Sequence, residues 1–195
     1  MDKAGWLRNA RHCLSPNHGE RPLDTPISLL VIHNISLPPG EYGGPDIEDF
    51  FCNRLDWQKH PFYQEIQGLK VSAHCLIRRD GELVQFVPLL LRAWHAGQSC
   101  HEGRGECNDF SIGIELEGCD HEPYEPRQYQ TLITLTQQLM ALFPAITAER
   151  IVGHEHIAPQ RKTDPGPSFD WNHYLNALSP LITLPGDTTP ETGNH

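Results

Sequence analysis

The chain has 195 residues and a formal net charge of −10, from 15 lysines and arginines against 25 aspartates and glutamates. This length fits one domain with its own core, and the acidic balance disfavours nucleic acids and anionic membranes as partners because both are negatively charged. No apolar run is long enough to span a membrane, and residues 1–12 lack the apolar region of a signal peptide. We therefore expect a cytoplasmic protein with a small-molecule ligand and no obligate protein partner.

The first elements along the chain are a buried strand and a long irregular segment. Residues 28–34 form a short apolar run that ends in polar residues, which is typical of a buried strand. Residues 35–70 are rich in proline and glycine, with one short helix expected near 46–54. A segment of this length and composition is expected to cover a site rather than contribute to the core.

Three further strands are expected in the middle of the chain. Residues 71–77 and 83–87 read as two strands joined by a hairpin turn at 79–82. Residues 111–117 alternate, so that Ile112, Ile114 and Leu116 share one face and the small or polar residues share the other.

Two helices are expected in the second half of the chain. Apolar residues recur at three- and four-residue steps over 126–143, with a proline in the first turn, and a shorter helix is expected over 171–178. Residues 181–195 are predicted to be a flexible tail. Strands followed by a helix that packs across them indicate an α/β (α+β) fold, with a single domain over residues 1–180.

The segment 153–166 carries histidines, a lysine and an aspartate between prolines and glycines, a composition that excludes a regular helix or a central strand. We expect an ordered functional loop whose nitrogen and oxygen donors suit zinc. His33, His154 and Asp164 could supply three ligands and leave a fourth position open, as a catalytic zinc requires. His156 is the obvious competitor for a ligand role, and spacing alone leaves the choice open.

Two charged residues are candidates for catalysis beside such a metal. Glu115 lies on the polar face of its strand next to Gly113, and it could take a proton from a water molecule as a general base. Lys162 lies two residues before Asp164 and could stabilise an oxyanion. The ordinary alternatives are a solvated edge carboxylate and an exposed lysine.

Several other residues carry weaker signals. Trp94 precedes a small turn and could stack against a sugar or a peptide, although large aromatic residues are more often part of a core. His74 could act behind the metal ligands. The six cysteines show no Cys-x-x-Cys spacing, so we expect reduced, mostly structural thiols rather than a thiolate zinc cluster.

Together these stretches resemble the zinc-dependent N-acetylmuramoyl-L-alanine amidases. The motifs that carry the resemblance are LLVIHNISLPPG at 29–40, VSAH at 71–74, RAWHAG at 92–97, CNDFSIGIELEG at 107–118, and the loop from 153 through 171. They are colinear and extend over roughly residues 5 to 178.

The resemblance implies a mixed β-sheet flanked by helices, as in peptidoglycan recognition proteins. It implies cleavage of the amide between the lactyl group of 1,6-anhydro-N-acetylmuramic acid and L-alanine of the stem peptide. The residue roles that it implies are zinc ligands at His33, His154 and Asp164, an activating base at Glu115, an oxyanion partner at Lys162, peptide contacts at Asn34 and Ala93, and a sugar wall at Trp94.

The chain also departs from the family pattern. Many relatives carry a tyrosine where this chain has Ala73. We expect Glu115 to take the catalytic role of that tyrosine. Some relatives carry arginines, linked to the peptide carboxylates, where this chain has Lys70 and Glu106. Lys70 keeps the positive charge but lacks the bidentate geometry of arginine. Glu106 would repel an acidic peptide, and the nearby Arg104 is a candidate substitute.

Two rival hypotheses remain at this stage. A non-catalytic sensor of peptidoglycan fragments would share the fold, but such receptors typically lose a zinc ligand and this chain keeps all three. A periplasmic amidase that acts on intact cell wall is the second rival, and the absence of a signal peptide disfavours it.

Overall fold

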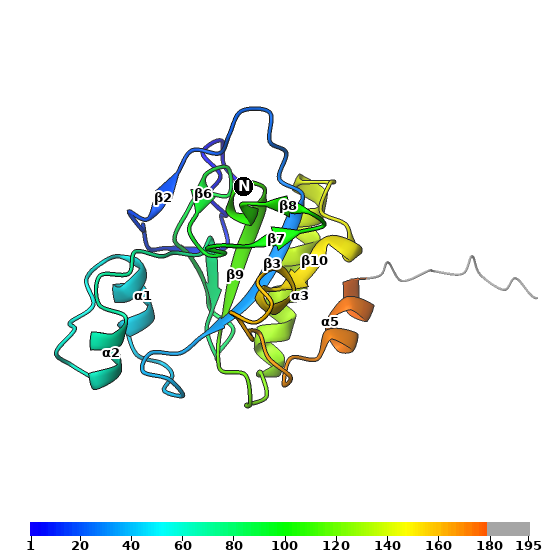
Figure 1. Ribbon diagram of the computed structural model, residues 1–195. Helices are drawn as coiled ribbons and strands as arrows, with labels where there is room; N and C mark the ends of the chain where they lie inside the picture. The colour runs from blue at the N-terminus through cyan, green and yellow to red at the C-terminus, as the bar shows by residue number, and fades with distance from the viewer. Residues whose placement is uncertain (179–195) are drawn as a thin grey trace, which may run out of the picture.

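In the computed structural model, which describes residues 1–178, a twisted six-stranded sheet forms the centre of the molecule (Figure 1). The spatial order of the strands is β1-β5-β4-β9-β3-β10. Their bounds are β1 Arg11–His12, β5 Leu83–Gln85, β4 Cys75–Ile77, β9 Ser111–Glu117, β3 Leu29–Ile35 and β10 Ile151–Gly153. The four strands from β4 to β10 are mutually parallel, whereas β5 runs antiparallel to β4, so the sheet is mixed as predicted.

The two faces of the sheet are covered by different helices. Ile112, Ile114 and Leu116 pack in one core cluster against α3 (Pro126–Leu142) and α5 (Trp171–Leu178). The predicted alternation of β9 and both predicted helices are therefore confirmed. Toward the opposite face, α1 (Asp46–Phe51) and α2 (Pro61–Glu65) belong to a second cluster that includes β4 and β5 residues.

Small elements complete the rim around the sheet. Two short antiparallel pairs are β2 (His18–Gly19) with β6 (Arg92–Ala93), and β7 (Cys100–His101) with β8 (Arg104–Gly105). The 3₁₀ turns η1 (Cys107–Asp109) and η2 (Ala148–Arg150) precede β9 and β10, and α4 (His154–Ile157) follows β10 directly.

Some predicted elements have different bounds in the structure. Only residues 75–77 of the expected strand 71–77 form a regular strand, because the N–H of Ser72 donates to the carbonyl of Trp94, outside the ladder of β4. The helix α2 was not predicted. The segment 153–166 contains one helical turn, α4, because Pro159 lies just after that turn and does not interrupt it. The predicted flexible tail, 181–195, lies outside the described residues.

The topology places three chain segments at one edge of the sheet. The strands β9, β3 and β10 are adjacent and parallel, so their carboxyl ends meet there, which is where open α/β sheets commonly bind ligands. His33 lies near the end of β3, opposite Glu115 in β9, and His154 comes directly after β10. Within residues 1–178, no helix is both long enough and apolar enough to cross a membrane.

Candidate metal centre and cleft

Two histidines and an aspartate meet at this edge of the sheet. The Nδ1 atoms of His33 and His154 lie 3.0 Å apart, and the Oδ2 atom of Asp164 lies 3.0 Å from the first and 3.1 Å from the second. Among the described residues, these three form the one group of His, Cys, Asp and Glu whose donor atoms could hold a metal ion. The fold therefore brings together the three residues that the sequence suggested as ligands.

The protonation states of His33 and Asp164 suit a bound cation. Burial lowers the pKa of His33 to about 4, an effect that the neighbouring carboxylate of Asp164 only partly offsets. Burial opposes ionisation of Asp164, but the contacts of its carboxyl group with His154 and His33 outweigh burial and lower the pKa of that carboxyl. For His33 and Asp164, a neutral imidazole and a carboxylate are the forms that bind metals.

The hydrogen bond at Nε2 of His154 determines whether its Nδ1 atom carries a proton. Its Nε2 atom lies 3.0 Å from the carbonyl oxygen of Ala96, which can only accept a hydrogen bond. In a neutral ring the proton is therefore on Nε2, and the Nδ1 lone pair faces His33 and Asp164. Three donor atoms that converge in this way fit a divalent metal such as zinc.

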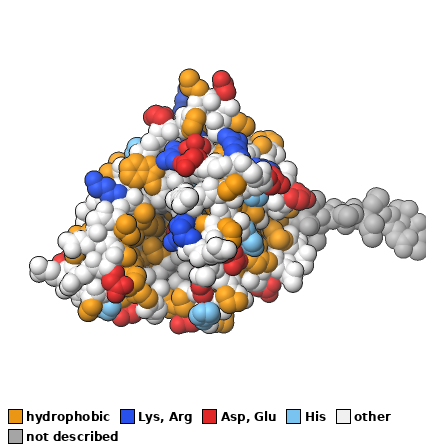
Figure 2. Space-filling view, viewed as in Figure 1, with side chains coloured by type: hydrophobic (Ala, Val, Ile, Leu, Met, Phe, Trp, Pro, Cys, Tyr) orange, Lys and Arg blue, Asp and Glu red, His pale blue; other side chains and the backbone are white. Residues whose placement is uncertain are grey.

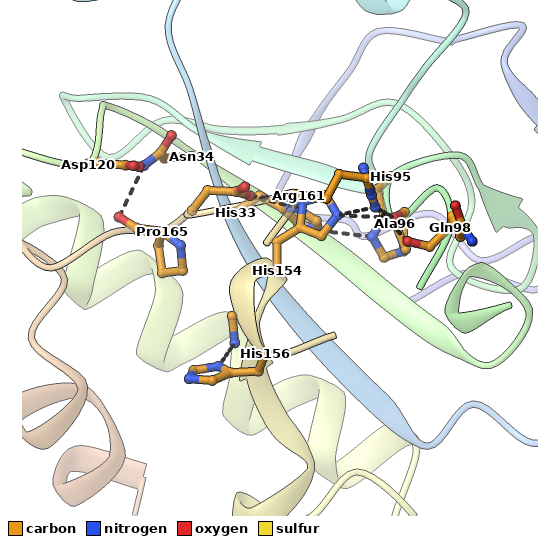
Figure 3. A network of polar contacts seen from close by, with 12 residues as sticks. His33, Asn34, His95, Ala96, Gln98, Asp120, His154, His156, Arg161 and Pro165 are labelled. Carbon is orange, nitrogen blue, oxygen red and sulfur yellow. Dashed lines mark hydrogen bonds and ion pairs between the residues drawn. The ribbon is translucent and has the colours of Figure 1, made fainter. Parts of the chain in front are cut away.

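His156, the competing ligand candidate, lies outside the cluster (Figure 3). Its Nδ1 atom accepts a hydrogen bond of 2.8 Å from the backbone N–H of Gly153, which stabilises the first turn of α4. Its side chain is half exposed and its ring packs beside Trp171. His156 therefore makes a local capping contact and contributes no donor atom to the group of His33, His154 and Asp164.

Glu115 is a buried carboxyl group without a partner. It is 8% exposed, and its Oε2 atom has no hydrogen bond among the described residues. Burial raises the pKa of Glu115 well above its usual value, the charge of Asp164 raises it further, and the charge of Lys162 lowers it. An unpaired buried carboxyl is costly for a fold, and perturbed groups of this kind cluster at functional sites.

A cleft of about 520 Å³ opens beside these residues. Its polar side contains the three cluster residues, Glu115 and Lys162. Its apolar side comes largely from the segment 35–70, as expected for a covering segment, and includes Leu37, Phe50, Phe62, Ile66 and Leu69. Figure 2 shows a hollow on this face of the molecule with hydrophobic side chains along it.

The residues predicted to bind substrate are only partly brought together. Trp94 lines the cleft. Asn34 also lines it, but its Nδ2 atom already donates to Oδ1 of Asp120 at 2.8 Å and to the carbonyl of Pro165 at 3.0 Å (Figure 3). Asn34 thus braces the loop that carries Asp164.

The other three predicted substrate contacts do not line the cleft. The Ala93 side chain is fully buried, so only its backbone is left to meet a ligand. Lys70 is exposed outside the cleft lining, and Arg104 stacks over the ring of Phe110 at 4.0 Å. Glu106 lies 3.4 Å from the guanidinium of Arg92. The roles of Ala93, Lys70 and Arg104 remain predictions.

Residues behind the cluster escaped sequence reasoning. His95 contacts the outer nitrogen of His33, with its Nδ1 atom 2.9 Å from Nε2 (Figure 3). Arg161 donates to the carbonyls of Ala96 and Gln98, both at 2.7 Å, and so holds the backbone that His154 contacts. His74 forms no hydrogen bond with the cluster residues, because its Nδ1 accepts from the N–H of Gly113 and its Nε2 lies 3.0 Å from the carbonyl oxygen of Leu91. His95, and not His74, therefore lies directly behind the cluster.

The six cysteines are free thiols, as expected. The sulfur atoms of Cys13 and Cys52 lie 3.5 Å apart, far from disulfide bonding distance.

Comparison with known proteins shows a consistent pattern. Residues 23–167 match the family described as N-acetylmuramoyl-L-alanine amidase. The chain is 59% identical over 175 residues to the 1,6-anhydro-N-acetylmuramyl-L-alanine amidase AmpD of Enterobacter cloacae, which covers 90% of this chain and 93% of the relative. The AmpD of Escherichia coli K12 is 58% identical, covering 92% and 97% respectively.

Solved structures agree with the sequence relatives. A crystal structure of a selenomethionine derivative of AmpD superposes with a TM-score of 0.89 at 55% identity, covering 92% of this chain and 99% of that one. The E. coli amidase AmiD, in complex with the substrate anhydro-N-acetylmuramic acid-L-Ala-D-γ-Glu-L-Lys, superposes with a TM-score of 0.58 at 32% identity. That match covers 81% of this chain and 60% of AmiD.

Proposed function

Because this chain belongs to the N-acetylmuramoyl-L-alanine amidase family, we propose that it hydrolyses the amide between the lactyl group of 1,6-anhydro-N-acetylmuramic acid and L-alanine of the stem peptide. We place this reaction in the cytoplasmic recycling of peptidoglycan fragments. The observation that carries the proposal is the metal-type cluster of His33, His154 and Asp164 in one cleft with the unpaired carboxyl of Glu115.

Zinc is the cofactor that we propose for the cluster. Two imidazole nitrogens and one carboxylate oxygen are a ligand set used by catalytic zinc, which keeps a further position open for water or substrate. When bound, zinc supplies Lewis acidity toward the scissile carbonyl and lowers the pKa of a bound water. His33, His154 and Asp164 would hold it.

Glu115 acts as the proton carrier in this proposal. Its free Oε2 atom and its place opposite His33 across adjacent strands allow it to take a proton from the attacking water. The same carboxyl group then delivers that proton to the amide nitrogen, so that the peptide leaves as an amine. Lys162, in the wall of the same cleft, stabilises the negative charge that develops on the carbonyl oxygen.

The experiment compares Asp164→Ala with His156→Ala, because the second change removes a nearby histidine that lies outside the cluster. We expect Asp164→Ala to lose both retained zinc and hydrolysis, measured by metal analysis and by release of free stem peptide. His156→Ala should keep both. Full hydrolysis by Asp164→Ala would overturn the assignment of the ligands.

The same assay separates the amidase from its two rivals. A zinc-loaded wild-type protein that binds the anhydro-muropeptide tightly but never cleaves it would be a sensor. Faster release of peptide from intact cell wall than from soluble anhydro-fragments would identify a wall amidase and would contradict the proposed role in recycling.

A further inference from the structure

His95 lies directly behind His33, on the side away from the metal-type cluster. Its Nδ1 atom is 2.9 Å from Nε2 of His33, and its Nε2 atom is 3.1 Å from the hydroxyl oxygen of Ser111. The two rings meet edge to face, with an interplanar angle of 84°. The backbone of His95 is fixed as well, because its N–H donates to Oδ1 of Asn108 at 3.1 Å.

The direction of each hydrogen bond from His33 through His95 to Ser111 follows from the contact that the Ser111 hydroxyl makes with the carbonyl of Cys107. The Ser111 hydroxyl lies 2.6 Å from the carbonyl oxygen of Cys107, which can only accept, so the hydroxyl proton points there. The Ser111 oxygen is then free to accept from Nε2–H of His95. A neutral His95 that is protonated on Nε2 has a bare Nδ1, which accepts from Nε2–H of His33.

This order leaves the inner nitrogen of His33 without a proton. In isolation His33 has a competing choice, because its Nδ1 atom lies 3.0 Å from Oδ2 of Asp164 and could donate to that carboxylate. Hydrogen bonds to ionised acceptors are strong, and this one would occupy the lone pair that a metal needs.

We propose that His95, oriented by Ser111 and the carbonyl of Cys107, is a positioning residue that holds His33 in its Nε2-protonated tautomer, so that Nδ1 serves as a metal ligand. This inference rests on the metal site of the proposed function and goes beyond it, because it assigns a role to a residue outside the ligand set. Partners of this kind fix ring orientation and raise ligand basicity at metal sites.

Strand β9 supports the same arrangement through a second residue. A Cβ atom on Gly113 would lie 2.4 Å from Cγ of His95, closer than real side chains approach. Ser111 therefore binds the His95 ring, and Gly113, two residues further on the same face, leaves space for it. A glycine inside a strand weakens that strand, and the place of the His95 ring explains why one is found here.

The test compares His95→Asn with His95→Leu. Asparagine can place an amide oxygen close to where Nδ1 lies and so keeps an acceptor for His33, whereas leucine fills similar space without one. We expect His95→Leu to weaken zinc binding by about 10–100-fold, measured by competition with a chromophoric chelator, and His95→Asn to recover most of that loss. No loss in either variant, or an equal loss in both, would overturn the proposal.

A second measurement needs neither a variant of His95 nor catalysis. Nitrogen-15 NMR of the metal-free, full-length protein reports which nitrogen of His33 carries its proton. We expect Nε2 in the wild type and an increased Nδ1-protonated fraction in Ser111→Ala, which frees His95 to change its own tautomer. A wild-type His33 protonated mainly on Nδ1 would refute the positioning role, while zinc-dependent hydrolysis would still stand.

Discussion

Glu115 is the residue whose environment says most about the chemistry, because a buried carboxyl group gains nothing for the fold when its Oε2 atom has no partner. Replacing it by glutamine keeps the shape of the side chain but removes the base. We expect Glu115→Gln to lose about 10²–10⁴-fold in hydrolysis rate while it retains zinc. Retained activity in a zinc-loaded Glu115→Gln protein would assign the base to another group.

The raised pKa of Glu115 also has a consequence for stability. In the metal-free protein the folded state holds this proton more tightly than the unfolded state does, because burial raises the pKa above the usual 4.5. The stabilising contribution is therefore complete below pH 4.5 and is lost as the pH rises through the folded-state pKa. Glutamine does not titrate, so we expect urea unfolding to show a smaller decline in stability with rising pH in metal-free Glu115→Gln than in the wild type.

Lys162 is coupled to Glu115 through charge, since its ammonium group lowers the pKa of that carboxyl. Removing the charge in Lys162→Met should raise the pKa of Glu115. The acidic limb of the pH–rate profile then moves to higher pH, in addition to a lower maximal rate from the lost oxyanion contact. Lys162→Arg keeps the charge and is the matched control for the shift. An unmoved limb in Lys162→Met would show that the base titrating in that profile is not Glu115.

The residues that we propose to contact substrate or metal were largely predictable, and those that lie behind them were not. His33, His154, Asp164, Glu115 and Lys162 carry donor chemistry in recognisable motifs, and the fold brings all five to one cleft. In the sequence, the neighbouring Trp94 was singled out as the candidate and His95 was not. The contact of His95 with His33, 62 positions away, cannot be seen from local spacing. Local spacing also could not distinguish His154 from His156, because which of the two faces His33 and Asp164 depends on the conformation of α4.

At the scale of elements, strand β9 connects the core with the site. One face packs in the core cluster that contains residues of α3, and the other carries Ser111, Gly113 and Glu115 toward His95 and the cleft. This division was predictable from the alternation of residues 111–117 alone.

Gly113→Ala tests this role of the strand. The new methyl group would overlap His95, so we expect a loss of about 1–3 kcal/mol in unfolding free energy together with weaker zinc binding. Gly105→Ala is a matched control, because its nearest neighbour would be 3.8 Å from the added Cβ atom, in a two-residue strand. A Gly113→Ala protein with wild-type stability and zinc affinity would contradict the tight packing of His95 on β9.

Short or irregular elements were the ones that sequence patterns missed. Residues 71–74 were predicted to belong to a strand, yet the N–H groups of Ser72 and His74 donate to the carbonyls of Trp94 and Gly113, outside the regular ladder. The helix α2 has five residues, begins with Pro61 and is capped by His60, too short for any helical periodicity to appear. The mixed sheet was implied by the family resemblance. Periodicity predicted the individual strands and helices but not how the strands pair.

At the scale of the whole molecule, the metal-type cluster connects distant parts of the chain. His33 and Asp164 are 131 positions apart, and the proposed ligands come from β3, from α4 and from the loop after it. Zinc that binds the folded state and not the unfolded chain adds about 4 kcal/mol of stability when free zinc is a thousandfold above its dissociation constant. We therefore expect a chelator to lower the melting temperature, and zinc to restore it.

Asp164→Ala provides the control for this experiment, because it removes one ligand and should show a melting temperature that does not respond to zinc. A wild-type melting temperature that is the same with zinc and with chelator would show that no zinc site of useful affinity links these segments.

The most direct test of the proposed amidase is mass-resolved hydrolysis of an anhydro-N-acetylmuramyl peptide by the full-length protein, with chelator and with zinc restored. We predict release of free stem peptide and intact anhydro-sugar, loss of the reaction on chelation, and recovery with zinc. An uncleaved substrate in the presence of the zinc-loaded protein, or cleavage that persists unchanged after chelation, would contradict a zinc amidase built on His33, His154 and Asp164.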